Sequence, residues 1–366
     1  MFLYHPEVDI NLNNLKENLD IIQSIVGSGK IMAVIKANAY GHGFIPIAKT
    51  LSQSNAHGFC VALAKEAKDL IDSGIKTPIL HLGRIHSSDL DLYDSGQVRC
   101  TINSIDDISL LKKNFSNKSP ISVHVKIDTG MGRMGSSYDN AEKIFKLIKD
   151  IPYIKVEAIY SHFSTSDEIN TEYRDCQLKR FIEVVECSKS LLSNIKYFHI
   201  ANSSAILTCK KSHFNMVRPG ISLYGVSPLG KPYEKLKPVM KMKSYVVLLK
   251  TIKAGESVGY NRLYISNKNE KIALVQAGYA DGIPLELSNS GSVEIQGENC
   301  PIIGKVSMDL VAVKCINNNI TIGDQAIFWG GSKNTSLEYV AKKSKCIPYQ
   351  FLTGVSSRVS RHYIYE

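Results

Sequence analysis

The chain has 366 residues, of which 44% are hydrophobic and 21% charged, and this is the composition of an ordinary globular protein. That length predicts two domains, or one barrel with an addition. No stretch approaches the roughly 20 uninterrupted apolar residues of a membrane span, and Met1–Glu7 lacks the basic and apolar regions of a secretion signal. We therefore expect a cytoplasmic protein without a membrane anchor.

The formal net charge of +10 is spread over lysines that stand singly or in pairs. No basic arm or aromatic-interleaved basic patch accompanies them, so solvated faces are favoured over a nucleic-acid site. The eight cysteines include no Cys-x-x-Cys pair and are interpreted as reduced, small apolar residues. Asp9–Asn13 resembles the start of a calcium loop, but Asn14 replaces the required glycine and Asp20 the final glutamate, so no metal site is predicted.

The first 220 residues alternate short apolar runs with amphipathic ones, after a capped helix predicted over Asp9–Val26. The near-continuous apolar character of the short runs is typical of parallel strands buried on both faces. Eight strand-then-helix units are what a (β/α)₈ barrel of the TIM type requires, although a doubly wound sheet stays open because alternation does not show closure. The predicted strands are Ile31–Ile35, Gly58–Val61, Pro78–Leu82, Val98–Ile102, Ile121–Ile127, Ile154–Ser161, Tyr197–Ile200 and Asn215–Arg218. The predicted helices include Ala64–Asp72, Ile105–Lys113, Asn140–Lys149 and Thr171–Leu192.

After residue 225 the pattern changes to β-rich runs separated by glycine and asparagine turns, with one clear helix near Ser336–Lys343. This pattern predicts a second, mainly-β domain. We place the first domain at residues 1–228 and the second at residues 229–366. The predicted strands of the second are Ser244–Ile252, Lys271–Ala277, Ser292–Ile295, Val311–Lys314 and Gln325–Trp329.

Candidate catalytic groups follow the predicted barrel strands, because a (β/α)₈ barrel carries its active site at their carboxyl ends. The first strand runs directly into Lys36. A lysine in that place is often an edge residue whose stem packs on apolar surface. At a barrel mouth, however, desolvation lowers the pKa of the amine, as a Schiff-base nucleophile needs.

Further polar groups follow four other predicted strands. Three glycines surround Arg133 in the loop Asp128–Gly135, and that arginine is available for bidentate binding of a carboxylate. His162 ends the sixth strand. Asn202-Ser203 forms a candidate helix start with free N–H groups for a phosphate, and Arg218–Ile221 offers another anion site. One mouth would thus hold a lysine, two arginines, a histidine and two phosphate cradles.

These segments resemble the signatures of the alanine racemases, in that family's order. Ala33–Gly43 looks like the family's pyridoxal-phosphate attachment motif, and matching segments run along essentially the whole chain. The others are Asp128–Gly135, Ser161–Phe163, Ala201–Ser203, Met216–Ile221, Val258–Tyr260, Gly278–Gly282, Gly304–Asp309, Ile347–Tyr349 and Ser356–Arg361.

The resemblance implies residue roles. Lys36 would bind pyridoxal 5′-phosphate as a Schiff base and act as one acid/base, and Tyr260 would be the other on the opposite face. Arg218 would face the pyridine nitrogen, His162 would bridge it to Tyr260, and Arg133 would bind the substrate carboxylate. The remaining implied residues are Tyr40, Asn202, Ser203, Gly220, Ile221 and Tyr349 for the cofactor, Tyr279, Met308 and Asp309 for the substrate pocket, and Lys126 as a carbamylation position of some members.

The resemblance also implies interconversion of L- and D-alanine for peptidoglycan, in a homodimer with shared active sites. Two positions depart from the family pattern, Asn261 where glycine is usual and Ser360 where proline is common. A broader amino-acid racemase stays open. A barrel decarboxylase would need a Cys-Asp-type acid in place of Tyr260, and a cofactor carrier would consist of the barrel alone.

Overall fold

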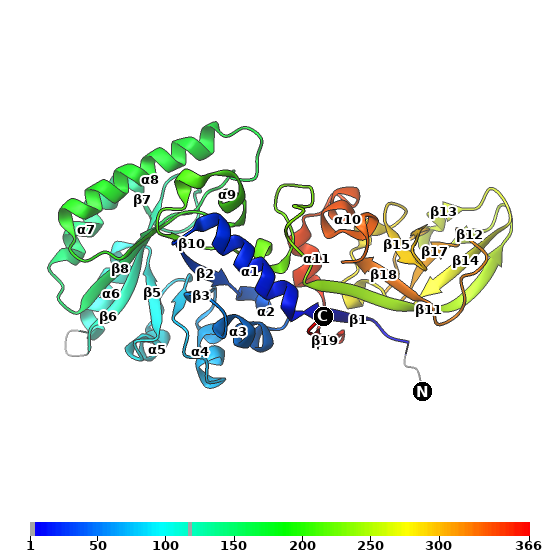
Figure 1. Cartoon of the computed structure of the whole chain (residues 1–366), viewed down its shortest axis with the longest axis horizontal. Coiled ribbons are helices and arrows are strands. Elements are labelled where there is room, and N and C mark those ends of the chain that lie inside the picture. The colour runs from blue at the N-terminus through cyan, green and yellow to red at the C-terminus, as the bar shows by residue number, and fades with distance from the viewer. Residues whose placement is uncertain (1–3, 116–118) are drawn as a thin grey trace. The chain divides into compact units, whose positions relative to one another are not determined.

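The computed structural model describes residues 4–115 and 119–366, and it divides into two compact units (Figure 1). The barrel unit consists of Asn18–Ala39 and Phe44–Leu223, and the β unit of Met1–Glu17, Tyr40–Gly43 and Tyr224–Glu366. Within the described ranges, no helix is both long and apolar enough to cross a bilayer. Met1–Leu3, part of the segment examined for a secretion signal, lies outside these ranges. The roles predicted for residues 1–228 and 229–366 stay predictions.

The barrel unit is built on eight parallel strands in the order β10-β2-β3-β4-β5-β6-β8-β9, with the two-residue β7 beside β6. The two ends of this sheet meet, because β9 and β10 are neighbours and the Arg218 N–H donates to the Ala201 carbonyl, 3.0 Å away, just beyond both strands. The predicted barrel is therefore confirmed. The strands are β2 Lys30–Val34, β3 Gly58–Val61, β4 Ile79–His81, β5 Val98–Ile102, β6 Ile121–Asp128, β7 Ser136–Ser137, β8 Ile154–Tyr160, β9 Tyr197–His199 and β10 Met216–Val217.

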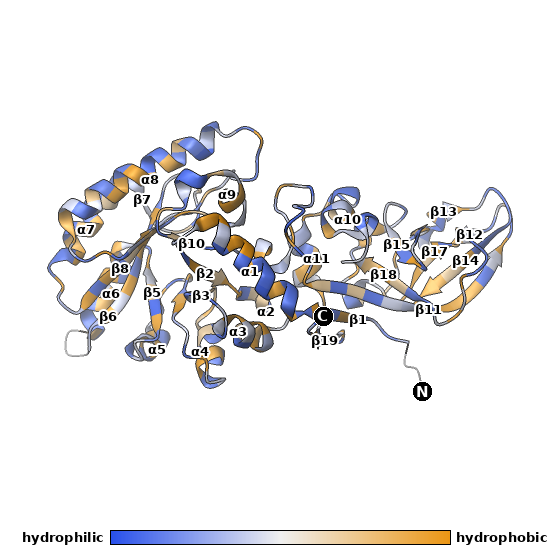
Figure 2. Ribbon diagram, viewed as in Figure 1, coloured by the Kyte–Doolittle hydropathy of each residue, from blue (hydrophilic) through white to orange (hydrophobic). Residues whose placement is uncertain are grey.

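The segments between the barrel strands form helices because the apolar residues of these segments recur at helical spacing. In α8 (Glu172–Leu191), Phe181, Val184 and Val185 are buried, and Figure 2 shows this helix as alternating apolar and polar segments. The other helices in this part of the chain are α1 Leu12–Val26, α2 Lys36–Tyr40, α3 Phe44–Ser52, α4 Ala64–Asp72, α5 Leu90–Asp94, α6 Ile105–Phe115, α7 Ala141–Lys149 and α9 Ser203–Thr208, with the 3₁₀ turns η1 Ser87–Asp89, η2 Tyr138–Asn140, η3 Lys210–Ser212 and η4 Ile221–Tyr224.

The β unit is organised around the long strand β11 (Met240–Ile252), which pairs antiparallel with β1, β14 and β18. The main sheet has the order β16-β15-β18-β11-β1-β19, and β14 and β17 extend from β11. The elements are β1 Glu7–Asn11, β12 Ser257–Val258, β13 Tyr264–Ile265, β14 Glu270–Val275, β15 Ser292–Ile295, β16 Glu298–Pro301, β17 Val311–Lys314, β18 Gln325–Trp329, β19 Ser360–Ile364, α10 Leu337–Lys343 and α11 Pro348–Gly354, with the 3₁₀ turns η5 Tyr260–Arg262, η6 Tyr279–Asp281, η7 Leu285–Leu287 and η8 Lys333–Thr335.

The start of the chain differs from its prediction. The helix expected from Asp9 begins only at Leu12, because Glu7–Asn11 forms β1 with alternating buried residues. The Asn11 side-chain oxygen accepts the N–H groups of Asn13 and Asn14, both at 3.0 Å, and so takes the capping role predicted for Asp9. Strands β16 and β19 and helix α11 were also not predicted.

Candidate active site

Lys36 lies at the carboxyl end of β2, one residue beyond Ile35, where the sequence predicted it. Burial lowers the pKa of its amine, and the positive charge of Arg133 lowers it further. Both effects favour the neutral amine, which is the nucleophilic form. The structure thus places a lysine whose pKa is lowered at the barrel mouth, within the electrostatic influence of the Arg133 guanidinium.

The backbone after Lys36 is left-handed, with φ values of 54° at Ala37, 56° at Asn38 and 52° at Ala39. This conformation costs residues with a Cβ about 1–2 kcal/mol each, so the surroundings must hold it. The Ala37 N–H donates to a Glu66 oxygen at 2.7 Å, and the Asn38 side chain accepts the Phe44 N–H at 2.8 Å. The second Glu66 oxygen accepts two further N–H groups at the start of α4. Glu66 therefore fixes the backbone beside Lys36, a role that the sequence did not reveal.

The loop that carries Arg133 is organised by Asp128 at the end of β6. The Asp128 carboxylate accepts the N–H groups of Gly130, Met131 and Arg133 at 2.8, 2.7 and 3.1 Å. Although burial raises the pKa of Asp128, these donors hold it below its ordinary value. At Gly130 φ is 135°, and an added Cβ would lie 2.5 Å from the Tyr173 hydroxyl. Asp128 thus fixes the backbone of the glycine-rich loop that carries Arg133.

Lys126 is buried on β6, and its ammonium position lies 5.7 Å from the centroid of the Tyr160 ring. Burial, together with the charges of Arg133 and Arg218, lowers the pKa of Lys126 to about 8. A substantial fraction of this amine is consequently neutral near physiological pH.

Arg218 is almost fully buried, with 4% of its surface exposed. Its guanidinium donates to the carbonyl oxygens of Ser161 at 2.6 Å and His199 at 3.0 Å, and to the rings of His199 and His162. No carboxylate in residues 4–115 or 119–366 forms an ion pair with it. Burial and the charge of Arg218 hold the pKa of His162 well below its ordinary value, so His162 is neutral.

Two of the segments predicted to bind a phosphate meet at Ser203. Its hydroxyl oxygen accepts the Gly220 N–H at 2.8 Å, the Ser222 N–H at 3.2 Å and the Ser222 hydroxyl at 3.0 Å. Asn202 caps α9 by accepting the Ala205 N–H at 3.1 Å. Hydroxyl and backbone N–H groups that follow β9 and β10 therefore lie together. Ile221 comes directly after Gly220 in the chain.

Two of the predicted site tyrosines lie next to each other in the β unit. The ring centroids of Tyr40 and Tyr349 are 5.9 Å apart, and Tyr224 packs against Tyr40 at 5.0 Å. Gly41 allows this approach, because φ is 81° and an added Cβ would lie 1.9 Å from the Leu352 carbonyl oxygen. Tyr40 is thereby held against α11, which carries Tyr349.

The predicted substrate-pocket residues form a second group in the β unit. The Tyr279 N–H donates to the Ser307 carbonyl at 3.0 Å, which brings Tyr279 close to Met308. Asp309 follows Met308 and accepts from Arg358 at 2.6 Å, while the same guanidinium donates to the buried Asp281, also at 2.6 Å. Arg358 therefore joins the two carboxylates through one guanidinium. The sequence did not predict this role.

Tyr260 opens η5 and is 66% exposed. Gly259 before it has φ 72°, and Asn261 after it has φ 61°. Asparagine tolerates the left-handed region better than most residues, so it accommodates the position at which the family usually has glycine.

The candidate residues of the barrel unit thus lie at the mouth of the barrel. The remaining candidates belong to the β unit. Their roles in catalysis stay predictions. The missed residues Glu66 and Arg358 act through backbone and side-chain positioning. The glutamate three residues into a predicted helix is a capping signal, but it does not indicate the bond to Ala37.

Comparisons with known proteins agree over both units. Residues 10–228 match the family model "Alanine racemase, N-terminal domain", and residues 239–363 match "Alanine racemase, C-terminal domain". An alanine racemase of Halothermothrix orenii is 35% identical over 97% of this chain and 96% of its own. One of Vesicomyosocius okutanii is 38% identical over 96% and 97%.

Solved structures show the same similarity. Alanine racemase from a D-cycloserine-producing Streptomyces lavendulae superposes with a TM-score of 0.92 at 27% identity, covering 100% of this chain and 98% of its own. The Bartonella henselae enzyme, described with covalently bound pyridoxal phosphate, gives 0.90 at 30% identity and covers 98% and 99%. Because both family models and these relatives together span nearly the whole sequence, the chain belongs to the alanine racemase family.

Proposed function

We propose that this protein interconverts L- and D-alanine, using pyridoxal 5′-phosphate attached to Lys36. The observation that carries the proposal is the Lys36 amine, whose pKa is lowered at the barrel mouth beside Arg133. The test is to incubate the purified protein and cofactor with a panel of L-amino acids and to separate the products on a chiral column. D-Alanine as the main product supports the proposal. A comparable rate with serine would support the broader racemase, and released CO₂ without a D-product would support the decarboxylase.

The donor set at the mouth fits the proposed cofactor. Lys36 would supply an amine for its carbonyl carbon, and the Ser203 hydroxyl, whose oxygen accepts the Gly220 N–H, would donate its own proton to the phosphate. Gly220 and Ile221, and Tyr40 and Tyr349 of the β unit, are the other proposed phosphate contacts. When bound, the cofactor withdraws electrons from the substrate's α-carbon and so makes its proton removable. Arg218 would face the ring nitrogen of the cofactor. Because a guanidinium only donates and stays protonated, it would not transfer a proton to that nitrogen, which would limit side reactions such as transamination.

The chain's own residues then move the α-proton. Lys36 is proposed to exchange it at D-alanine and Tyr260 at L-alanine, each from its own face. Arg133 would hold the substrate carboxylate through two parallel hydrogen bonds, which fixes the α-carbon between the two bases. Neutral His162, 3.4 Å from Arg218, would join that arginine to the Tyr260 phenol. Tyr279, Met308 and Asp309 would shape the pocket that admits a small side chain.

We further propose a homodimer in which the β unit of one chain completes the barrel mouth of its partner. Tyr260 is 66% exposed, and near it in the sequence Leu263 and Ile265 are 49% and 55% exposed. Met308, also a proposed pocket residue, is 52% exposed. Catalytic and apolar side chains displayed to this extent are typical of a surface that another chain covers.

Lys126 is the proposed carbamylation site. A neutral amine adds to CO₂, forming a carbamate and releasing one proton, and the lowered pKa of about 8 keeps part of Lys126 in that form. The resulting anion would pair with Arg133 and orient it for the substrate. In the cell, we propose that the enzyme works in the cytoplasm and supplies D-alanine for peptidoglycan.

A further inference from the structure

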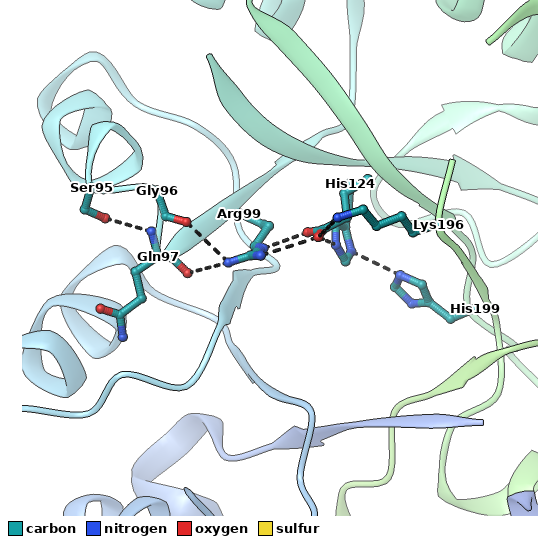
Figure 3. A network of polar contacts seen from close by, with 8 residues as sticks. Ser95, Gly96, Gln97, Arg99, His124, Lys196 and His199 are labelled. Carbon is teal, nitrogen blue, oxygen red and sulfur yellow. Dashed lines mark hydrogen bonds and ion pairs between the residues drawn. The ribbon is translucent and has the colours of Figure 1, made fainter. Parts of the chain in front are cut away.

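A chain of polar side chains runs through the interior of the barrel unit, starting at Arg218. The Arg218 guanidinium contacts Nδ1 of His199, and Nε2 of His199 lies 3.1 Å from Nδ1 of His124. Nε2 of His124 lies 3.6 Å from the Glu157 carboxylate, which pairs with Arg99 at 2.7 Å. Figure 3 shows His124 between Arg99 and His199, with Lys196 reaching in from the side of His199.

Each of these side chains is carried by or directly follows a different barrel strand. His199 comes from β9, His124 from β6, Glu157 from β8 and Arg99 from β5. His199 is fully buried and His124 is 2% exposed. The Tyr160 ring lies parallel to His199, with centroids 4.8 Å apart and planes 4° apart. Side chains packed in this way have little freedom to change partners.

The hydrogen-bonding capacity of the end groups determines where the protons lie. Arginine is only a donor, so Nδ1 of His199 must accept from Arg218 and its proton is on Nε2. That proton points to Nδ1 of His124, which must also accept, so the His124 proton is on Nε2 as well. This proton faces Glu157, and an ionised carboxylate only accepts. One arrangement of two neutral rings therefore satisfies every contact.

The charges agree with this arrangement. Burial lowers the pKa of His124 and, together with Arg218, that of His199, so both rings are neutral. Although burial raises the pKa of Glu157, its contacts with His124 and Arg99 hold it well below the ordinary value. A proton added to His124 would place one N–H against another at His199.

We propose that Glu157 is a positioning residue for Arg218, acting through His124 and His199 held as their Nε2–H tautomers. This proposal rests on the proposed function, in which Arg218 binds the ring nitrogen of the cofactor. A carboxylate in direct contact would draw the guanidinium into an ion pair and away from a ligand. Two imidazoles away, the carboxylate orients the His199 ring that accepts from Arg218 without itself forming an ion pair with the guanidinium.

The first test observes the two tautomers directly. Holoenzyme labelled with ¹⁵N-histidine is examined by two-bond proton–nitrogen NMR, and His124→Gln and His199→Gln assign the signals among ten histidines. We expect both rings to be neutral with the proton on Nε2. A proton on Nδ1 of either ring, or a doubly protonated ring, would overturn the proposal.

The second test compares two variants that disturb the same ion pair. Glu157→Gln removes the carboxylate that accepts from His124, whereas Arg99→Lys keeps that carboxylate and the positive charge beside it. For Glu157→Gln we expect kcat to fall about 10–100-fold with the KM for alanine little changed, as is typical when a supporting partner of a binding group is lost. Its His124 and His199 signals should also shift. For Arg99→Lys we expect unshifted signals and a kcat within about twofold of the parent.

The possible outcomes separate the two proposals. Equal losses of kcat in both variants with unshifted histidine signals would show that Glu157 is only structural. If Glu157→Gln does not fold, Glu157→Asp retains the charge but is one methylene shorter, and it should give an intermediate kcat. An unmodified protein that racemises alanine but has different tautomers contradicts the positioning role alone. Failure of the unmodified holoenzyme to racemise alanine contradicts the proposed function, whatever the tautomers.

Discussion

The two groups of candidate residues differ in how completely their own unit holds them. At the barrel mouth, Lys126 and Arg218 are buried, and Arg218 is surrounded by acceptors. On the β unit, Tyr260 and Met308 are mostly exposed. Preorganised groups bind and orient without further change, whereas exposed ones need a covering surface before they act in a dry site. The comparison supports the proposal that the barrel holds its candidate residues in place by itself, whereas the exposed candidates of the β unit act in an assembly.

The largest expected effect is at the barrel mouth. Lys36→Ala should abolish racemisation and covalent cofactor attachment, because no other amine in the proposal serves both purposes. The unmodified protein should be yellow, and after borohydride reduction mass spectrometry should locate the cofactor on the peptide containing Lys36. A cofactor fixed to another lysine would contradict the assignment.

Tyr260→Phe tests the exposed group. It should lose about 10²–10⁴-fold in kcat, the usual effect of removing a general acid/base, while keeping the cofactor absorbance of the parent. Tyr365→Phe is a matched control, since it removes a hydroxyl from another tyrosine of the β unit that is 65% exposed and has no proposed role. Solvent-deuterium incorporation from each enantiomer should show which exchange is lost, and equal rates for variant and parent would refute the two-base assignment.

Mixing Lys36→Ala and Tyr260→Phe chains tests whether the exposed group serves a partner. In a shared-site dimer, each heterodimer has one intact site and one doubly altered site, so random reassociation should restore about a quarter of the sites. The heterodimers would be isolated through two different tags and assayed. Pure heterodimers without activity would mean that both residues act within one chain.

A smaller, pH-dependent effect is expected at Lys126. Because carbamylation needs the neutral amine, its extent should rise as pH increases through the pKa of about 8, and fall toward pH 6. Lys126→Ala should raise the KM for alanine through Arg133, and added acetate should partly restore it by replacing the missing anion. Native mass spectrometry in bicarbonate at several pH values would follow the modification. No CO₂ adduct at any of these values would contradict it.

The sequence predicted the barrel unit more completely than the β unit, for a physical reason. Strands buried on both faces are continuous apolar runs, so β3, β5 and the residues directly after the strands, such as Lys36 and His162, could be located from the pattern alone. Strand β1 was interpreted as part of a helix because five alternating residues lead directly into α1. Tyr260 could be identified only through the family resemblance, since an exposed tyrosine in a turn has no distinguishing pattern.

The polar residues inside the barrel were also missed. His124 and Glu157 each interrupt an apolar strand, and a single polar residue in such a strand does not show which partner it meets. Their contacts join residues 75 and 58 positions apart, so they depend on the barrel order rather than on local spacing. A polar side chain two positions from Lys126 on the same strand was the available signal, because residues i and i+2 share a face.

The position of β1 bears on how the protein is made. This strand lies between β11 and β19, antiparallel to the first and parallel to the second, so residues 7–11 pair with residues 240–243 and 360–364. During synthesis the first strand emerges from the ribosome long before either neighbour, whereas the barrel strands pair mostly with neighbours close behind them. The last barrel strand is therefore complete at residue 217, whereas β1 gains its first neighbour at residues 240–243 and its second only at residues 360–364. A tag or chaperone that occupies residues 7–11 would consequently delay the β unit, and with it the appearance of activity, without hindering formation of the barrel.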